Sequence, residues 1–301
     1  MRMRLYLFEL EKLIRKPFYL TAAAGSFLFT AIGWRVYAEQ ADFHAGEAQA
    51  VMLLLMELHG LLAAMLIIIF TAPVFAGEYS LKMEELLQTA ANGMEKTACG
   101  KAAAVLTLSL SIFGILLGSD YLFIRCVWGK EIWRAGMMRP AAEELDTVLA
   151  VSCGRAFTAS FFLGICAVIL LAGAVYCLST FAHTPFQSAT GAGIGYFVCQ
   201  LLYNWGIRAG FLPAAYLFSF SPVVLARFQL FRKPWEGKWF GGFYLWLVPV
   251  ITIVLCAVFF LSGRRGFSRR PGGFKITTFD LPKPGLVWGW LHCFPGIQSI
   301  I

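Results

Sequence analysis

The chain has 301 residues, of which 59% are hydrophobic and only 14% carry a charge. Soluble domains carry about 25% charged residues, so this chain lacks the polar surface that a globular protein needs in water. The composition therefore excludes a soluble enzyme and predicts an all-α integral membrane protein. The net charge of +8 favours basic chain ends held against an anionic membrane surface over nucleic-acid binding.

Six apolar runs are long enough to cross a membrane, because a span needs about 20 apolar residues. They cover residues 18–38, 51–76, 102–124, 156–181, 187–207 and 241–262. A six-span domain is thus predicted over residues 1–262, followed by a basic tail over 263–301. Both chain ends are rich in Lys and Arg, which the positive-inside rule places in the cytoplasm. We expect a multi-pass protein of the cell membrane with both termini cytoplasmic, although the basic outer loop 125–155 fits this orientation less well.

An amphipathic helix is predicted over residues 2–16, ahead of the first span. At 100° per residue, most of its apolar side chains fall on one arc, and Glu9, Glu11 and the basic residues fall on the other. A basic amphipathic helix before a span lies in the plane of the membrane interface. Pro17 then ends the helix and turns the chain into the membrane.

A second two-faced helix is predicted over residues 78–96, between the second and third spans on the cytoplasmic side. Its apolar residues share one arc, whereas its charged and amide side chains share the other. Two spans can be joined by a few residues, so a helix of this length is not needed as a linker. Two interpretations remain open: a connector lying in the interface, or a docking helix for a cytoplasmic partner.

Short motifs within and near these two helices resemble those of a known family of membrane proteins. They are Phe8–Pro17, Phe75–Tyr79 followed by Leu86-Leu87-Gln88-Thr89, and Gly100-Lys101 at the start of the third span. Together with the six-span layout they resemble the ABC-2 type permeases, which are the membrane subunits of ATP-binding-cassette exporters. Leu81-Lys82 and Asn92–Lys96 stand where many members have Gly-Thr and Pro-x-x-Arg, which indicates a divergent relative.

The resemblance implies that residues 1–17 form an elbow helix and that 78–96 form a coupling helix, which docks on an ATP-binding cassette subunit. Residues 208–238 would form a re-entrant extracytoplasmic segment. A second permease copy or a homologous permease would complete the pathway among membrane lipids. The coupling residues would be Glu78, Lys82, Glu85, Leu86, Leu87 and Thr89, with a second contact at His183 in the turn between the fourth and fifth spans.

The chain lacks the residues of a nucleotide site. Six residues separate Gly93 from Gly100, where a P-loop has four, and Ala102 follows Lys101 in place of Ser or Thr. ATP would therefore be bound by the partner subunit, and no cofactor or metal is expected in this chain. The glutamate pairs 84–85 and 143–144 lie outside the spans and lack the following Arg of intramembrane proteases, so we expect no enzyme activity.

Polar residues within the spans are candidates for a transport pathway: Glu57, His59, Gln200 and Asn204. Glu57 either pairs with Arg35 or lines the pathway. Gln200 and Asn204 are four residues apart on one helix face, where they line a cavity or bond between helices. No buried carboxylate is expected at mid-membrane, which disfavours an ion-coupled carrier.

Three further points stay open at this level. An ATP-independent membrane sensor or binding protein, and an ion-coupled carrier, are the alternatives to a permease. The cargo class, whether peptide, lipid, drug or ion, does not follow from the fold. Cys126 and Cys153 flank the predicted outer loop and form either a disulfide or two free thiols, and Gly191, Gly193 and Gly195 are expected to permit close helix packing.

Overall fold

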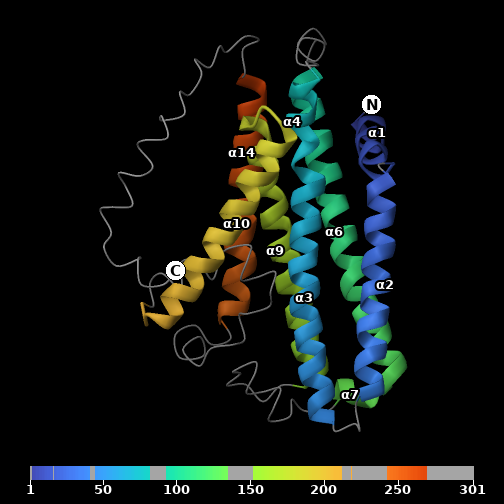
Figure 1. Cartoon of the computed structure of the whole chain (residues 1–301). Helices are drawn as coiled ribbons and strands as arrows, with labels where there is room; N and C mark the ends of the chain where they lie inside the picture. Colours follow the sequence, from blue (N-terminus) through green and yellow to red (C-terminus); the bar gives the residue numbers. More distant parts are fainter. Residues whose placement is uncertain are drawn as a thin grey trace, which may run out of the picture. The chain divides into compact units, whose positions relative to one another are not determined.

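The structure is a computed structural model that describes residues 2–15, 17–40, 45–81, 93–134, 152–211, 218 and 243–269. The chain divides into two compact units, Met1–Ser268 and Arg269–Ile301, and the packing described below belongs to the first. The described residues form nine α-helices and no β-strand, which confirms the all-α prediction (Figure 1).

The helices are α1 Arg2–Ile14, α2 Pro17–Gln40, α3 Ala45–Thr71, α4 Pro73–Ser80, α6 Gly93–Trp128, α7 Glu131–Arg134, α9 Cys153–Phe181, α10 Pro185–Arg208 and α14 Phe243–Arg269. Each of the six predicted spans coincides with helical structure. Within the described ranges, four segments are long and apolar enough to cross a membrane: Leu58–Ser80, Lys96–Cys126, Phe157–Phe181 and Leu247–Phe267. These four helices define a helical membrane protein.

Several element boundaries differ from the sequence prediction. The second predicted span is divided at Pro73, because proline has no N–H with which to continue the helix of α3. Helix α6 begins at Gly93, nine residues before the predicted third span, and its 36 residues exceed the thickness of a membrane. Helix α14 continues to Arg269, so the first basic residues of the predicted tail 263–301 lie on a helix.

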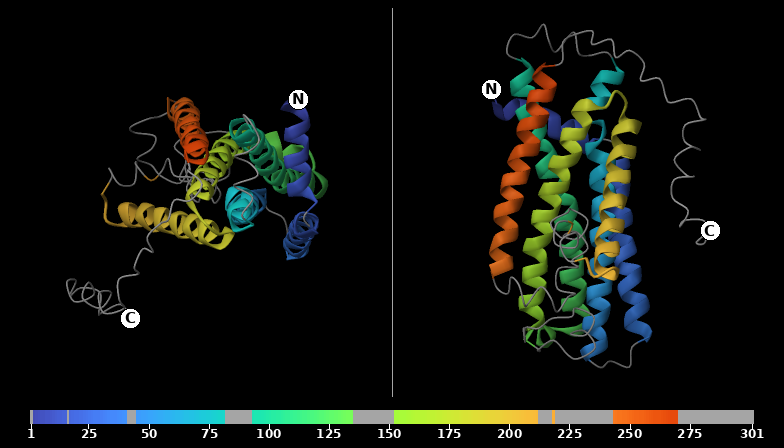
Figure 2. Two further views of the ribbon diagram at one scale, coloured as in Figure 1. Left: turned by 90° about the horizontal axis from the view of Figure 1, so that it is seen from above. Right: turned by 90° about the vertical axis from the view of Figure 1, so that its left-hand side faces the viewer.

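Helices α3, α6 and α9 pack against one another, and the other elements attach to them. Helices α1 and α2 contact α6, whereas α10 contacts α4, α9 and α3. Figure 2 shows α1 lying across the direction of its neighbours and α10 strongly inclined to α9. Helix α1 is thus not aligned with the helices that follow it.

Tyr176 of α9 connects three neighbouring helices. Its hydroxyl donates a hydrogen bond of 3.0 Å to the main-chain O of Ala98 in α6. Its ring packs edge-on against Phe75 of α4 and beside Phe260 of α14. A Cβ placed on Gly263 of α14 would lie 2.7 Å from Tyr176 Cε1, so the absence of a side chain is what lets α14 approach α9.

Helices α2 and α10 have inverted polarity, with apolar side chains outside and polar ones inside. Helix α2 buries Tyr19, Ser26, Thr30 and Trp34 and exposes Phe27, Leu28, Phe29, Ile32 and Val36. Helix α10 buries Ser188, Ala192, Gln200 and Tyr203 and exposes Ile194, Phe197, Val198, Leu201 and Trp205. A helix on the surface of a water-soluble protein shows the reverse pattern, so these outer faces suit lipid.

The glycines of α10 do not have the packing role expected of them. A Cβ placed on Gly191, Gly193 or Gly195 would have no neighbour within 4 Å, so none of the three permits a close approach between the described residues.

Candidate functional site

Lys101, at the first predicted turn of the third span, is the centre of a buried ion cluster. Its Nζ donates to Glu78 Oε1 at 2.6 Å, to Glu9 Oε2 at 3.1 Å and to the main-chain O of Val74 at 3.1 Å. Lys12 Nζ donates to the same Glu78 oxygen at 3.2 Å. We call Glu9, Lys12, Glu78 and Lys101 the lysine cluster; it joins α1, α4 and α6.

Most of the buried polar atoms of the lysine cluster are paired. Lys101 is only 1% exposed, and its three acceptors match the three N–H donors of an ammonium group. The half-exposed Lys12 supplies the second positive charge that balances the two buried glutamates. Removing water from an ion costs several kcal/mol, and these contacts offset that cost in part, because Glu78 Oε2 has no hydrogen-bond partner among the described residues.

The position of Glu9 corrects the prediction for the first helix. The amphipathic pattern placed Glu9 on the polar arc, but its side chain is buried against Lys101, while Leu7 and Phe8 are exposed. Helix α1 faces α6 through Leu5, which lies against Gly100, and through the Tyr6 hydroxyl, which bonds Thr107 Oγ1 at 3.1 Å. The opposing lysine, 92 residues away in sequence, makes this carboxylate an inward-facing residue.

Glu78 lies in the last turn of α4, which ends at Ser80, and not at the start of a separate helix. A carboxylate at a helix C-terminus is disfavoured by the macrodipole, so the two lysine ammonium groups supply the charge that this position needs. The remaining residues predicted for coupling, Lys82, Glu85, Leu86, Leu87 and Thr89, lie outside the described residues.

His183 lies in the exposed turn between α9 and α10. Its main-chain N–H donates to Gln187 Oε1, and the Thr184 side chain caps α10 by accepting from the main-chain N–H of Gln187. This turn is at the same end of the molecule as Glu78. Gly266 of α14 lies beside Phe181, and the adjacent Phe267 packs against Tyr79.

A second buried polar cluster lies at the other end of α6. His59 Nδ1 and Asp120 Oδ2 are 2.7 Å apart, and His59 Nε2 is 3.1 Å from Thr30 Oγ1. Trp34 Nε1 donates to Asp120 Oδ1 at 3.2 Å. We call Thr30, Trp34, His59 and Asp120 the histidine cluster; all four are almost completely buried, and they join α2, α3 and α6.

The two clusters are separated by the thickness of a membrane. Asp120 follows Lys101 by 19 residues of α6, which is about 28 Å at 1.5 Å per residue. The hydrocarbon core of a bilayer is about 30 Å thick. The distance along α6 between the two clusters thus matches the thickness of the hydrocarbon core. Asp120 is a buried carboxylate that the sequence analysis did not single out, and it lies near the end of the predicted span 102–124 and not at its middle.

The histidine cluster contains the hydroxyl, imidazole and carboxylate groups of a catalytic triad, but its hydroxyl is not placed to act as a nucleophile. In such triads the hydroxyl gives its proton to the imidazole and then attacks a substrate. Here Thr30 Oγ1 donates to the main-chain O of Ser26 at 2.9 Å, and Thr30 has no exposed surface. Its hydroxyl is therefore unavailable to a substrate, and the cluster is a link between helices.

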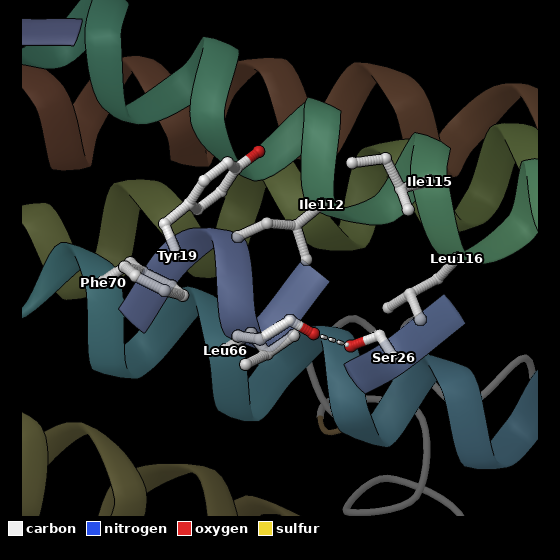
Figure 3. A pocket seen from close by; sticks show the side chains of 8 residues that line it. Tyr19, Ser26, Leu66, Phe70, Ile112, Ile115 and Leu116 are labelled. Carbon is white, nitrogen blue, oxygen red and sulfur yellow. Dashed lines mark hydrogen bonds between the residues drawn. The ribbon is translucent and has the colours of Figure 1, made fainter. Parts of the chain in front are cut away.

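A small cavity lies one helical turn from the histidine cluster, between α2, α3 and α6 (Figure 3). Its lining is apolar except for Tyr19 and Ser26. Ser26 Oγ donates to the main-chain O of Ala22, and the Tyr19 hydroxyl bonds Ser111 Oγ. Because both hydroxyls are already bonded, the cavity offers no free polar group to a ligand.

The residues predicted to line a pathway are not gathered at one site. His59 belongs to the histidine cluster. Gln200 is buried on the inner face of α10, and neither of its amide atoms has a hydrogen-bond partner among the described residues. Asn204 is half-buried on the same helix, and Glu57 lies in α3 with its side chain outside the described part. Cys126 is a free, exposed thiol, so the structure contains no disulfide to Cys153.

Comparison with known proteins adds no family assignment. No protein-family model matches the chain, and no curated protein matches it.

Proposed function

We propose that this chain is the permease subunit of an ABC transporter, located in the cell membrane with both termini cytoplasmic. It forms the transmembrane pathway with a second permease copy or a homologous permease. A separate ATP-binding cassette subunit docks on its coupling segment and supplies the energy for export. The observation that carries the proposal is the lysine cluster, which links the amphipathic helix α1, the end of α4 and the start of α6 by buried ion pairs.

The lysine cluster stands where force from a docked partner would enter the membrane domain. Glu78 lies two residues before the end of α4 at Ser80 and begins the predicted coupling segment 78–96. A displacement of that segment would act on Glu78, and through Lys101 on α6 and on Glu9 of α1. Ion pairs strengthen as the local dielectric falls, so a buried cluster resists separation better than exposed pairs do. A passive connector in the interface would need no such link.

Helices α2 and α10 complete the proposed six spans. Each has 24 residues, or about 36 Å of helix, which is enough to cross the hydrocarbon core. Their mean hydropathy is lowered by polar residues on the buried face, whereas the exposed face is apolar. The mean hydropathy of the whole helix therefore understates how well α2 and α10 suit a membrane, because lipid would contact only their outer face.

Helix α10 is the proposed wall of the pathway. The buried amide of Gln200 and the buried hydroxyl of Ser188 have no partner among the described residues. Unpaired polar groups are costly in a closed protein interior, and they become favourable when water or a polar cargo passes beside them. This role for Gln200, with Asn204 one turn further, favours a cargo that offers hydrogen-bonding groups.

The proposal is tested first by affinity purification of the tagged chain from its native membrane in mild detergent. We expect a co-purifying protein with a P-loop, and ATPase activity in the eluate. The coupling role is tested by Leu87→Asp, which places a charge at a predicted coupling residue and should abolish co-purification while the chain still inserts. Leu81→Asp is the comparison variant, since Leu81 is exposed and is not one of the predicted coupling residues. Loss of the partner with both variants, or with neither, would contradict the assignment of Leu87 to the coupling contact.

An ion-coupled carrier is the alternative that one observation favours. The buried Asp120 and His59 pair is of the residue types that hold exchangeable protons within membranes. Its position at a span end, and not at the midplane where carriers bind their ions, ranks this function second. Proton uptake by liposomes that contain this chain alone, with no ATPase in the native complex, would reverse the ranking.

A further inference from the structure

The histidine cluster joins three helices through buried side chains. Asp120 comes from α6, His59 from α3, and Thr30 and Trp34 from α2. The two α2 side chains cover the His59–Asp120 pair. The Phe29 ring lies edge-on to His59 at 6.3 Å and Phe27 packs beside Phe123 of α6, whereas Leu28 and Ile32 belong to the exposed apolar face of α2.

The hydrogen bonds of the cluster define how many protons its side chains share and which atoms donate them. The Thr30 hydroxyl has one proton, and it is donated to the main-chain O of Ser26. Thr30 can therefore only accept from His59, which requires a proton on His59 Nε2. A single proton then lies between His59 Nδ1 and Asp120 Oδ2. Whichever of these atoms holds it, the pair as a whole is neutral, which explains how both groups are tolerated in a fully buried place.

The neighbouring part of the interface is less well filled. The cavity of Figure 3 separates α2 from α3 and α6 on the side of the histidine cluster that faces the lysine cluster. A cavity forfeits dispersion contacts between the surfaces that line it. Thr30 and Trp34 attach the outer half of α2 by polar bonds, and Phe27 on Phe123 and Gly33 beside Leu55 add packing contacts.

We propose that the histidine cluster is a latch that holds the outer half of α2 on α3 and α6. With the latch closed, α6 is joined to α1 and α4 by the lysine cluster at one end and to α2 and α3 at the other. Movement at the lysine cluster then reaches the far face of the membrane through one rigid group of helices. The latch depends on the membrane placement proposed above, but not on an ATP-binding partner.

The test is cysteine labelling of the whole chain in lipid nanodiscs, where both faces meet the reagent. Ser26→Cys reports on the α2 interface, because residue 26 is buried beside the latch and lines the cavity. Ala172→Cys in α9 has no exposed surface and reports on general loosening. A charged methanethiosulfonate is the reagent, and mass spectrometry of the labelled peptides separates each probe from the native cysteines.

Opening the latch should raise labelling at position 26 at least tenfold without changing position 172. Thr30→Val and Asp120→Ala break the latch, and Thr30→Val is the milder change should Asp120→Ala fail to fold. Asp120→Asn should stay closed, since its amide can donate to His59 Nδ1 and its oxygen can still accept from Trp34. Tyr19→Phe, which removes an α2–α6 bond outside the latch, is the matched control.

Three results would overturn the proposal. One is unchanged labelling at position 26 when the latch is broken. Another is an equal rise at positions 26 and 172, which would mean that the cluster supports the fold in general. The third is Asp120→Asn opening as fully as Asp120→Ala. None of these results bears on co-purification of an ATPase, so the permease proposal stands or falls separately.

Discussion

Replacing Lys101 with methionine tests whether the lysine cluster is an energetic centre of the fold. The substitution keeps the length of the side chain and removes its charge. The carboxylate oxygens of Glu9 and Glu78 both lie within about 3 Å of the lost ammonium, hence within about 6 Å of each other. At an effective dielectric constant of about 20, two like charges at that distance repel by about 3 kcal/mol. Lys12 is 46% exposed, so it offsets this repulsion in part.

The expected loss of unfolding free energy is about 3–5 kcal/mol, the range found when one partner of a buried ion pair is removed. The measurement is reversible unfolding of the purified chain in mixed micelles with increasing fraction of sodium dodecyl sulfate, followed by circular dichroism. A triple variant, Glu9→Gln, Glu78→Gln and Lys101→Met, leaves only the half-exposed Lys12 charge without its partner and should recover most of the loss. A change below about 1 kcal/mol for Lys101→Met alone would refute the reasoning.

Three further substitutions test the packing and the membrane faces. Gly263→Ala places a methyl against Tyr176 and should lower the free energy of unfolding by about 1–3 kcal/mol in the same assay. Gly191→Ala, with open space around it, is the control and should be neutral. Equal effects of the two variants would contradict the close approach of α14. Tyr176→Phe removes the bond to Ala98 and should cost about 1 kcal/mol, and no loss would mean that the bond contributes nothing. Leu28→Lys, on the exposed face of α2, should make the free energy of membrane insertion less favourable by about 2.5–3.5 kcal/mol. Glycosylation mapping would report this as a smaller inserted fraction, and full insertion would argue against lipid contact at this face.

The positions of the helices followed closely from local sequence. Long apolar runs predicted helices at all six spans, and the 2–16 periodicity predicted α1 with Pro17 starting the next helix. These features depend on neighbouring residues along the chain, so a single sequence is sufficient to reveal them. The division at Pro73 was not predicted, although a proline within an apolar run is a local signal for a helix break.

The sequence did not predict which helix faces pack together or which ionisable side chains are buried. Glu9 was predicted to lie on the polar face of its helix, and Asp120 was not among the candidate residues, because neither has a partner nearby in sequence. Their partners, Lys101 and His59, lie 92 and 61 residues away. The predictions for Lys82 through Thr89, for the ATP-binding partner and for the cargo remain predictions.

The sequence by itself determined that this chain is a helical membrane protein, because apolar composition and run length act on each segment independently. Tertiary structure alone decided that α6 carries a buried ionisable side chain near each end, joined to α1 and α4 at one and to α2 and α3 at the other. A charge can enter a low-dielectric interior only with its partner in place. That condition depends on the folded arrangement of several helices, and no single segment contains it.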